Sequence, residues 1–394
     1  MKQLRSIGLL MLAVASMSGG AFAQEPDGAP PEPENDRWIV QFEGAPSENE
    51  IDALISYTGG QTVKRLHLIN GRAVRGPESM VATLRTSILV KRVEKDVIRK
   101  ATAAKPAPGE TLPWGVDRID AEKAWGTSTG SGIKVAVLDT GISKSHPDLK
   151  GNIKGGFNAV NDLNEIPEDQ NGHGSHVAGT IAAVDNNIGV VGVAPQASLY
   201  AVQVLNAAGW GYCSDIIQGL NWSIENSMQV ANMSYGGSEC LGEGDALAAA
   251  YANGITLVAA AGNNYGGAVD WPAKHDKVIA VTAINSKDGF ASFSSQGPEV
   301  DLTAPGVSIP STYKKGGYKT LSGTSMAAPH VSGVAALVLE KNSKLTPADV
   351  KKRLEQTAEC LGSLGSCSTN GTKNWLQGWG LVDACKAVNG TSCQ

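Results

Sequence analysis

The sequence predicts an α/β fold: a mainly parallel sheet with helices on both faces, preceded by a small α+β domain of ferredoxin-like order. In the larger C-terminal part, short β-branched apolar runs alternate with segments of helical periodicity, which is typical of parallel sheets covered on both sides. In the smaller N-terminal part, strand and helix patterns follow the order βαββαβ. The 47 glycines suit such a turn-dense fold.

The chain begins with the pattern of an export signal. Lys2 and Arg5 precede an apolar stretch that ends near Val14, and the small-x-small sequence Ala21-Phe22-Ala23 follows. We therefore expect a signal peptide over 1–23 and a secreted protein. No apolar run is long enough for a membrane span. Residues 24–37 are rich in proline and acidic residues, and we expect a disordered spacer there.

The small domain is predicted over residues 38–98. Its expected elements are a strand over 38–42, a helix over 47–57, two strands joined at Asn70-Gly71, a helix over 77–87 and a strand over 90–95. Residues 99–110 read as a linker, with Arg99-Lys100 followed by an alanine-rich run that a protease could cut within 99–104. The domain is either removed by such a cut or kept as a permanent binding module.

The large domain is predicted over residues 111–390. Strands are expected at 133–138, 198–205, 230–234, 255–260 and 278–283, with helices beginning at 173, 214, 245 and 346. In parallel sheets of this kind, functional sites gather at the carboxyl ends of the strands. Asp139 follows the first of these strands.

Ser325 lies where a glycine-flanked turn gives way to small and apolar residues at helical spacing. A helix N-terminus there would stabilise negative charge through its free N–H groups and its dipole, as a nucleophile that creates an oxyanion requires. Pro329 agrees with a helix start, because proline is tolerated in a first turn. A lone serine here could equally cap a buried helix.

Two further motifs favour catalysis, namely Asp139-Thr140-Gly141 and the segment 171–179 with His173. A serine hydroxyl needs a base, and the base needs a carboxylate that holds its tautomer. Asp139, His173 and Ser325 supply these groups, and in these motifs the chain resembles the subtilisin-like (subtilase) serine peptidases. His176 could also act as the base, but the resemblance implies His173. The segment has Ser175 where threonine is commoner in the family.

The resemblance also implies an oxyanion hole and a substrate cleft. Asn263 resembles the oxyanion asparagine of the family, acting with the backbone N–H of Ser325. A polypeptide substrate would lie as an added strand between two glycine-rich segments. The expected contact residues are Ser234, Tyr235, Gly236, Gly237, Ala260, Ala261 and Gly262. Leucine is more frequent in the family where Tyr235 stands.

Asp270 is the most informative departure from the family pattern. Aligning Trp271-Pro272 with the family's aromatic-proline pair places Asp270 at the foot of the specificity pocket. A carboxylate there would favour Arg or Lys before the scissile bond, because a charge in a narrow pocket is costly unless it is paired. Alternatively, Asp270 points to solvent from a variable loop.

Calcium is the cofactor that the resemblance implies, in a structural role only. A hard cation takes carboxylate, amide and backbone carbonyl oxygens, and would pin the mature N-terminus to a loop. The expected ligands are Glu110, Asp148, Val184, Asn186, Ile188 and Val190. A turn that needs its Asp and Asn for conformation alone is the alternative.

The six cysteines, in an exported chain, imply disulfides. Proximity alone suggests the pairs Cys213–Cys240, Cys360–Cys367 and Cys385–Cys393. No CxxC pair suggests zinc. A net charge of −5 without a basic, aromatic-interleaved patch excludes nucleic acid as a partner.

Together these features predict a secreted, autoprocessed serine endopeptidase, a monomer that acts on polypeptides through an acyl-enzyme on Ser325. The resemblance implies that 38–98 is a propeptide that inhibits the enzyme within the same chain and templates its folding. The residues alone leave two alternatives open: an acyl transferase on the same scaffold, and a catalytically silent binding protein.

Overall fold

The computed structural model describes residues 36–100, 110–369 and 372–390, which belong to one compact unit spanning Glu34–Gln394. The predicted signal peptide (1–23), nearly all of the spacer, residues 101–104 of the cleavage region and Cys393 lie outside the described residues. The unit is not divided at the predicted boundary between the small and large domains, which therefore stays a prediction.

The small domain has the predicted order of elements. They are β1 (Arg37–Phe42), α1 (Glu48–Tyr57), β2 (Gln61–Leu66), η1 (His67–Ile69), β3 (Gly71–Arg75), α2 (Glu78–Arg85) and β4 (Val90–Lys95). The strands form an antiparallel sheet in the order β2-β3-β1-β4. Helix α1 begins with a capping box in which Ser47 and Glu50 satisfy each other's backbone N–H groups. Its own buried cluster includes Trp38, Val40 and Leu84.

The large domain contains a seven-stranded sheet in the order β13-β12-β11-β10-β6-β8-β7, in which every neighbouring pair is parallel. This confirms the predicted fold class. The strands are β6 (Lys134–Asp139), β7 (Ile153–Asn158), β8 (Ser198–Gln203), β10 (Val230–Met233), β11 (Thr256–Ala260), β12 (Val278–Ile284) and β13 (Val300–Pro305).

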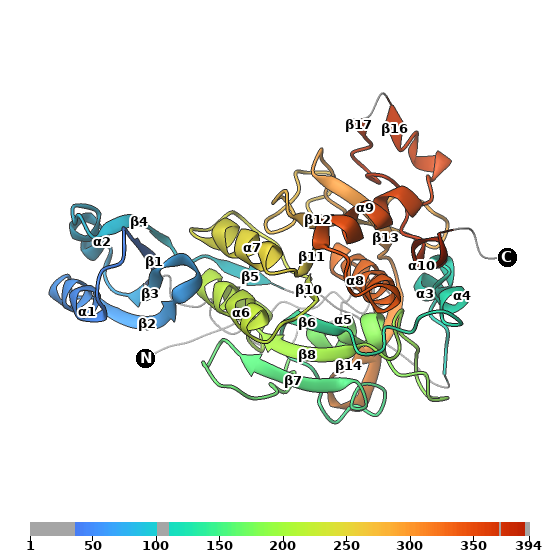
Figure 1. Ribbon diagram of the computed structural model, residues 1–394, viewed down its shortest axis with the longest axis horizontal. Coiled ribbons are helices and arrows are strands. Elements are labelled where there is room, and N and C mark those ends of the chain that lie inside the picture. Colours follow the sequence, from blue (N-terminus) through green and yellow to red (C-terminus); the bar gives the residue numbers. More distant parts are fainter. Residues whose placement is uncertain (1–35, 101–109, 370–371, 391–394) are drawn as a thin grey trace, which may run out of the picture. The chain divides into compact units, whose positions relative to one another are not determined.

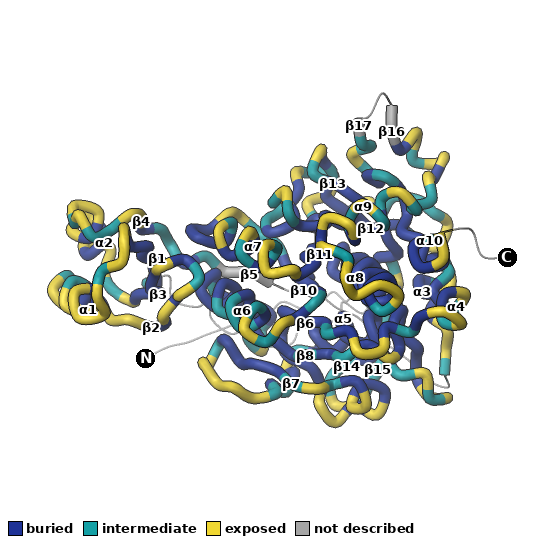
Figure 2. The backbone as a smooth tube through the Cα atoms, viewed as in Figure 1, coloured by how far each residue is buried: buried dark blue, intermediate teal, exposed yellow. Residues whose placement is uncertain are grey.

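Helices cover both faces of this sheet (Figure 1). They are α5 (His173–Ala182), α6 (Cys213–Glu225), α7 (Glu243–Ala252) and α8 (Thr324–Lys341). Alternate residues of β6 enter different clusters: Val135 and Val137 pack with α5 and α8, whereas Ala136 and Leu138 pack with α6 and α7. The central strands are accordingly buried along their length (Figure 2).

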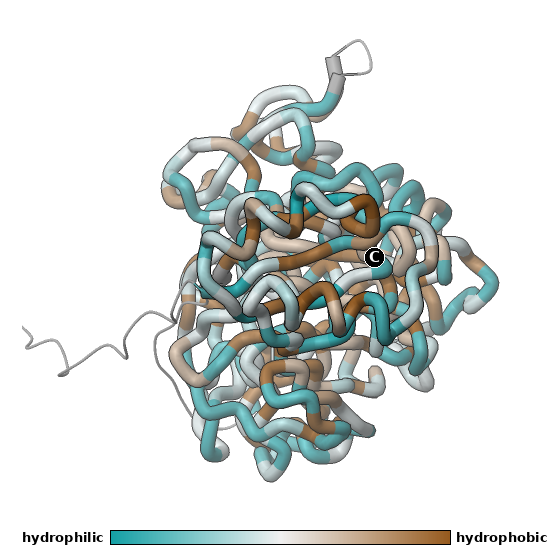
Figure 3. Tube along the Cα trace, turned by 90° about the vertical axis from the view of Figure 1, so that its left-hand side faces the viewer, coloured by the Kyte–Doolittle hydropathy of each residue, from teal (hydrophilic) through white to brown (hydrophobic). Residues whose placement is uncertain are grey.

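The remaining elements are helix α9 and a set of shorter helices and strands. They are β5 (Ile98–Lys100), α3 (Trp114–Arg118), α4 (Ala121–Ala124), β9 (Trp210–Tyr212), β14 (Ile309–Tyr313), η2 (Lys314–Gly316), β15 (Gly317–Leu321), α9 (Pro347–Thr357), η3 (Gly362–Leu364), β16 (Ser368–Thr369), β17 (Thr372–Lys373) and α10 (Ala384–Asn389). Apolar stretches run through the interior, and hydrophilic residues predominate on the outer turns (Figure 3). No helix in the described part of the chain is both long and apolar enough to cross a membrane.

Pro329 does not lie in the first turn of its helix, contrary to our prediction. Helix α8 begins at Thr324, so Pro329 is an interior residue. A proline there removes the N–H that would bond the carbonyl four residues earlier, which is that of Ser325. The helix nevertheless continues beyond Pro329 to Lys341 and is buried over almost its whole length.

The small domain contacts helices α6 and α7. Its Ile39 and Ile69 belong to the same buried cluster as Leu220 of α6 and Leu247 of α7. The same contact buries charge. Asp215 of α6 forms ion pairs with Arg37 of β1 at 3.5 Å and with Lys64 of β2 at 3.4 Å.

The chain that follows the small domain continues along the large domain. Strand β5 pairs antiparallel with β9, with Ile98 opposite Tyr212 and Lys100 opposite Trp210. One residue earlier, the Val97 carbonyl accepts a hydrogen bond from Cys213 N at 2.9 Å. Asp96 accepts one from Ser214 N, also at 2.9 Å, at the N-terminus of α6.

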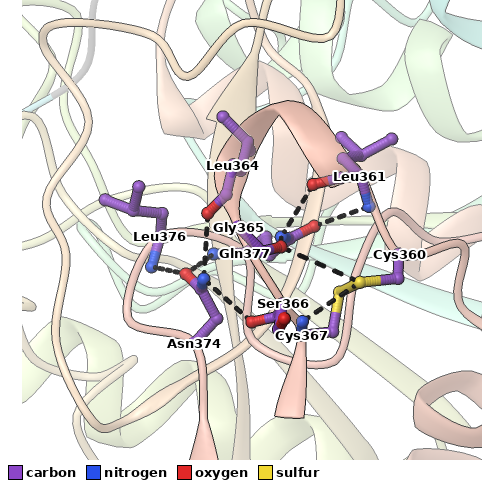
Figure 4. Close-up of a disulfide and its surroundings, with 9 residues drawn as sticks. All are labelled: Cys360, Leu361, Leu364, Gly365, Ser366, Cys367, Asn374, Leu376 and Gln377. Atoms are coloured by element: carbon purple, nitrogen blue, oxygen red, sulfur yellow. Dashed lines mark hydrogen bonds between the residues drawn. A yellow bond between two sulfur atoms is a disulfide. The ribbon is translucent and has the colours of Figure 1, made fainter. Parts of the chain in front are cut away.

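Two of the predicted disulfides, Cys213–Cys240 and Cys360–Cys367, are confirmed. Cys385 is also in a disulfide, but its predicted partner Cys393 lies outside the described residues. The loop around Cys360–Cys367 is held by hydrogen bonds to side chains that it encloses (Figure 4). Gln377, fully buried, accepts from Leu361 N at 2.9 Å and donates to the carbonyls of Leu361 and Gly365 at 3.1 and 2.8 Å.

Candidate active site

Asp139 and His173 form a buried pair. Asp139 is the last residue of β6 and His173 the first of α5, and neither side chain is exposed. His173 Nδ1 lies 2.8 and 2.9 Å from the two carboxylate oxygens of Asp139. Thr140 N also donates to Asp139 Oδ1, at 2.7 Å, and helps to fix the carboxylate. A carboxylate in this position holds the imidazole with its Nδ1 protonated and Nε2 open to a reacting group.

A second buried carboxylate, Asp169, builds the turn that leads into α5. Its Oδ1 accepts from the backbone N–H of Asn171 and Gly172 at 2.9 and 2.7 Å, and from the hydroxyl of Thr140 at 2.9 Å. Its Oδ2 accepts from both the N–H and the hydroxyl of Ser175. Burial raises the pKa of Asp169, against the effect of these donors. Ser175, which stands where the family more often has threonine, thus has Asp169 as its hydrogen-bond partner.

Ser325 is the second residue of α8 and is 5% exposed. Its hydroxyl donates to the carbonyl of Ser234 at 3.0 Å. Among the described residues, the buried His173 Nε2 has no hydrogen-bond partner. The structure thus contains the His173–Asp139 contact but no hydrogen bond between the serine and the histidine. Catalytic hydrogen bonds are often long or poorly aligned without substrate, so this geometry does not exclude Ser325 as nucleophile.

Asn263 is anchored through its side-chain oxygen, which accepts from Thr324 N at 3.0 Å and from Thr324 Oγ1 at 3.1 Å. This contact directs the amide nitrogen away from Thr324 and leaves it as the donor. Thr324 Oγ1 also accepts from Gly262 N at 3.2 Å. Thr324, which the sequence did not single out, therefore joins the start of α8 to the segment that follows β11.

A cavity of about 380 Å³ opens beside Ser325 and Asn263. It is lined by Tyr235, Gly236, Ala260, Gly262, Asn263, Asn264, Asp270, Thr324 and Ser325. Four of the predicted substrate contacts are in this lining. Of the others, Ser234 bonds to Ser325, whereas the N–H groups of Gly237 and Ala261 bond to Trp271 and Val281 within the fold.

Asp270 is partly buried in this cavity rather than directed from a loop into solvent. A Cβ added at Gly262 would lie 2.4 Å from Asp270 Oδ2, and one at Gly236 would lie 2.9 Å from the same atom. Only glycine therefore lets both backbone segments pass beside the carboxylate. Asn264 Nδ2 donates to Asp270 Oδ1 at 2.9 Å and holds the side chain in this place.

The predicted calcium ligands come from three segments that meet. Buried Asp148 accepts from Asn186 Nδ2 and from Val190 N, both at 2.9 Å. Glu110 accepts from Asn186 N and Asn187 N, both at 2.8 Å. Burial raises the pKa of Asp148, although these donors favour its charged form. A further bond from Thr111 N to the Gly189 carbonyl, at 2.8 Å, joins the N-terminal segment to the loop.

The donors of this group fit a hard cation. Two carboxylates, an amide and the carbonyls of Val184, Ile188 and Val190 make an all-oxygen set, which suits calcium. In the structure the amide nitrogen of Asn186 faces Asp148. To bind an ion through its oxygen, the amide would have to take the opposite orientation. In the described residues, the only His, Cys, Asp or Glu triad with metal-ligand spacing is Cys213, Cys240 and Glu243, whose sulfur atoms are joined in a disulfide.

Comparisons with known proteins agree with this fold. The Subtilase family model, Peptidase_S8, matches residues 130–380. Subtilisin E of Bacillus subtilis (strain 168) is 44% identical over 336 residues, which cover 83% of this chain and 86% of that protein. Subtilisin Savinase of Lederbergia lenta is 48% identical over 277 residues, which cover 70% of this chain and 98% of that protein. The matched family model and these identities show that the chain belongs to the subtilase family and is a serine endopeptidase.

Proposed function

We propose that this endopeptidase works through Ser325 as nucleophile, His173 as general base and Asp139 as the group that orients the base. The buried His173–Asp139 pair, with Nε2 unpartnered among the described residues, is the observation that carries the proposal. A carboxylate fixed on Nδ1 prepares Nε2 to take a proton and stabilises the imidazolium that results.

The reaction begins when the Ser325 hydroxyl turns from the Ser234 carbonyl toward His173 Nε2. As Ser325 Oγ bonds to the peptide carbon, its proton passes to His173, and negative charge moves to the peptide oxygen. The amide nitrogen of Asn263 and the N–H of Ser325 would hold that charge, since Asn263 Oδ1 is fixed on Thr324. His173 then gives the proton to the leaving amine, and water hydrolyses the acyl ester by the same route.

The test replaces the nucleophile and the base. Ser325→Ala and His173→Gln should reduce the rate of casein hydrolysis to a small fraction of the wild-type rate. A serine-directed phosphonate should no longer label Ser325→Ala. His176→Asn is the matched control for the second histidine, provided that it folds. Casein hydrolysis by Ser325→Ala at the wild-type rate would refute the assignment of the nucleophile.

We also propose that residues 38–98 are a propeptide that inhibits the enzyme within the same chain and is removed by self-cleavage within 99–104. Support comes from β5, which pairs as an antiparallel strand with β9 of the large domain, so the end of the small domain is bound to it through backbone hydrogen bonds. The ion pairs of Arg37 and Lys64 with Asp215 on α6 would hold the small domain there.

Two measurements address processing. The Ser325→Ala chain should stay full-length, whereas the active chain should lose its N-terminal part, and N-terminal sequencing should begin within residues 100–105. An identical N-terminus on both chains would mean that another protease makes the cut. A separate 38–100 polypeptide should inhibit the mature enzyme, and Lys64→Glu should weaken that inhibition.

A preference for Arg or Lys before the scissile bond is the third proposal. It is supported by the position of Asp270 in the cavity beside Ser325, and by Arg99-Lys100 at the expected cleavage region. Peptide substrates that differ only in Arg, Lys, Phe or Leu should show at least about tenfold better kcat/KM for the basic residues. Asp270→Asn keeps the size of the side chain and should abolish the difference. A preference of the unmodified enzyme for Phe or Leu would end this proposal.

We propose that calcium binds at Glu110, Asp148, Val184, Asn186, Ile188 and Val190. When bound, the ion would tie the N-terminal segment of the large domain to a loop and slow local opening. The chemistry of acyl transfer does not need it. A chelator should lower the unfolding temperature and speed autolysis of the wild type, but not of Asp148→Asn. An unchanged unfolding temperature in the wild type would exclude the site.

The protein is proposed to act outside the cell, as a monomer on polypeptide substrates. The pattern of residues 1–23 and the disulfides support export. Fractionation of a culture that expresses the full chain should place the enzyme in the medium, and light scattering should give the mass of one chain.

A further inference from the structure

The carbonyl of Ser325 lacks the partner that a helix normally provides. In an α-helix the carbonyl of each residue accepts from the N–H four positions later, and for Ser325 that position is Pro329, which has no N–H. A buried carbonyl without a donor is costly, and it would leave the start of α8 poorly fixed. A donor from outside the helix would remove this cost.

Ser234 supplies that donor. Its hydroxyl donates to the Ser325 carbonyl at 2.9 Å, and the Ser325 hydroxyl donates back to the Ser234 carbonyl at 3.0 Å. The two serines thus form a reciprocal pair, in which one bond uses the side chain of Ser234 and the other only its backbone. Ser234 is fully buried, so water does not compete for the first bond.

Two more buried residues orient the Ser234 hydroxyl. Asn232 Nδ2 donates to Ser234 Oγ at 2.8 Å, which occupies an acceptor site of that oxygen and directs its hydrogen toward Ser325. Ser332 Oγ donates to Asn232 Oδ1, also at 2.8 Å, and so fixes which end of the amide faces Ser234. Neither Asn232 nor Ser332 is exposed. The chain of bonds leaves α8 at Ser332, crosses β10 at Asn232 and returns to α8 at Ser325.

We propose that Ser332, Asn232 and Ser234 are positioning residues that fix the nucleophile in place. Together they supply the Ser325 carbonyl with the hydrogen bond that Pro329, which has no N–H, cannot donate. The inference rests on the proposed role of Ser325 as nucleophile. The Cα of Ser325 lies between its N–H, expected in the oxyanion hole, and its carbonyl, held by Ser234. A shift of the carbonyl therefore moves both the attacking oxygen and an oxyanion donor, and misplacement by about 1 Å can cost about 10²-fold in rate.

The first experiment separates positioning from stability. Ser234→Ala removes the hydroxyl but keeps the backbone that is expected to contact substrate. We expect kcat for a peptide amide to fall about 10- to 100-fold with KM within about twofold of wild type. Ser128→Ala is the matched control, because Ser128 is also buried and its hydroxyl lies 2.8 Å from a carbonyl of the same helix, that of Leu337, and 2.7 Å from Glu340 Oε2. It should lower the unfolding temperature to a similar extent and leave kcat unchanged.

The second experiment restores the missing donor. Pro329→Ala gives α8 an N–H at the position from which a regular helix would bond the Ser325 carbonyl. The double variant Ser234→Ala/Pro329→Ala should therefore recover at least about tenfold of the kcat that Ser234→Ala loses, whereas Pro329→Ala alone should stay near wild type. Ser332→Ala, which acts through Asn232, should reduce kcat less than Ser234→Ala does.

The outcomes are distinct. A kcat for Ser234→Ala within twofold of wild type, an equal loss in Ser128→Ala, or a double variant no faster than Ser234→Ala would overturn the positioning role. Each of these results is compatible with Ser325 as nucleophile. Failure of that assignment would instead appear as hydrolysis and phosphonate labelling that persist in Ser325→Ala.

Discussion

The two sides of the active site differ in how completely their hydrogen bonds are formed. On the side of α5, the carboxylate of Asp139 already holds His173 Nδ1, and neither side chain is exposed. On the side of α8, the Ser325 hydroxyl donates to the Ser234 carbonyl, and His173 Nε2 has no partner in the described part of the chain. The proposed base is thus already held within the fold, whereas the proposed nucleophile still has to turn toward it.

This difference follows from the charge that each side would carry during the proposed reaction. In the proposed mechanism a protonated imidazole forms in a buried site, so its counter-charge must be fixed beforehand. A serine hydroxyl is neutral and rotates about a single bond, so a temporary acceptor such as the Ser234 carbonyl costs little to leave. Three substitutions and a change of pH can break or sharpen the comparison.

Asp139→Asn should have the largest effect, because an amide would favour the wrong tautomer of His173. We expect kcat to fall by about 10⁴-fold, the magnitude that the same change produces in another Ser-His-Asp peptidase. Steady-state hydrolysis of a chromogenic peptide measures it. A loss below tenfold would mean that the preformed pair is not what prepares the base.

Asn263→Ala should come next, since it removes one donor for the oxyanion on the side of α8. The expected fall in kcat is about 10²–10³-fold with little change in KM, the range that loss of the oxyanion asparagine produces in a subtilisin. Asn264→Ala, one residue further along, is a control that should change the preference for the substrate side chain rather than kcat. Equal losses of kcat in both variants would argue against a specific oxyanion role.

Thr324→Val should have a smaller effect. The substitution keeps the shape of the side chain but removes the hydroxyl that donates to Asn263 Oδ1 at 3.1 Å, while the backbone donor at 3.0 Å remains. With one of two anchors left, kcat should fall by about threefold to tenfold. Kinetics of Asn263→Ala/Thr324→Val should show no further loss beyond Asn263→Ala, and additive losses would contradict the anchoring role.

Changes in pH should have the smallest effect, on stability, through one buried histidine on each side. Burial lowers the pKa of His176 on α5 to about 3 and that of His330 on α8 to about 4. Because the unfolded chain binds protons near pH 6.5 and the folded one does not, stability should be constant above that pH. It should fall as the pH drops from about 6.5 toward 4.

Thermal unfolding of Ser325→Ala, which we expect to be free of autolysis, measures this slope. His176→Asn and His330→Gln should each flatten it, even if each also lowers the unfolding temperature at pH 7. Opposite behaviour, with stability rising as the pH drops through this range, would show that these imidazoles are charged in the folded protein.

Several parts of the fold were predictable because their signals are local. The expected strand over 133–138 is found as Lys134–Asp139, and the capped helix expected from residue 346 is found from Pro347 with Thr346 as its cap. Both disulfides within the described residues follow from proximity along the chain. Strand Ile153–Asn158 was missed, because Gly155-Gly156 has low strand propensity. There, a Cβ at Gly156 would lie 2.5 Å from the Ala201 carbonyl, so glycine is needed for the close approach of β8.

For the candidate site, the sequence by itself determined which chemical groups are present, since the motifs around Asp139, His173 and Ser325 carry the family resemblance. It could not reveal that Asp169 builds the turn before His173, or that Ser234 replaces the donor that Pro329 lacks. Those contacts join residues 91 positions apart in the case of Ser234 and Ser325. Only the tertiary structure decided them, because a buried carbonyl accepts whichever donor the packed chain brings within reach, and spacing along the sequence does not encode that proximity.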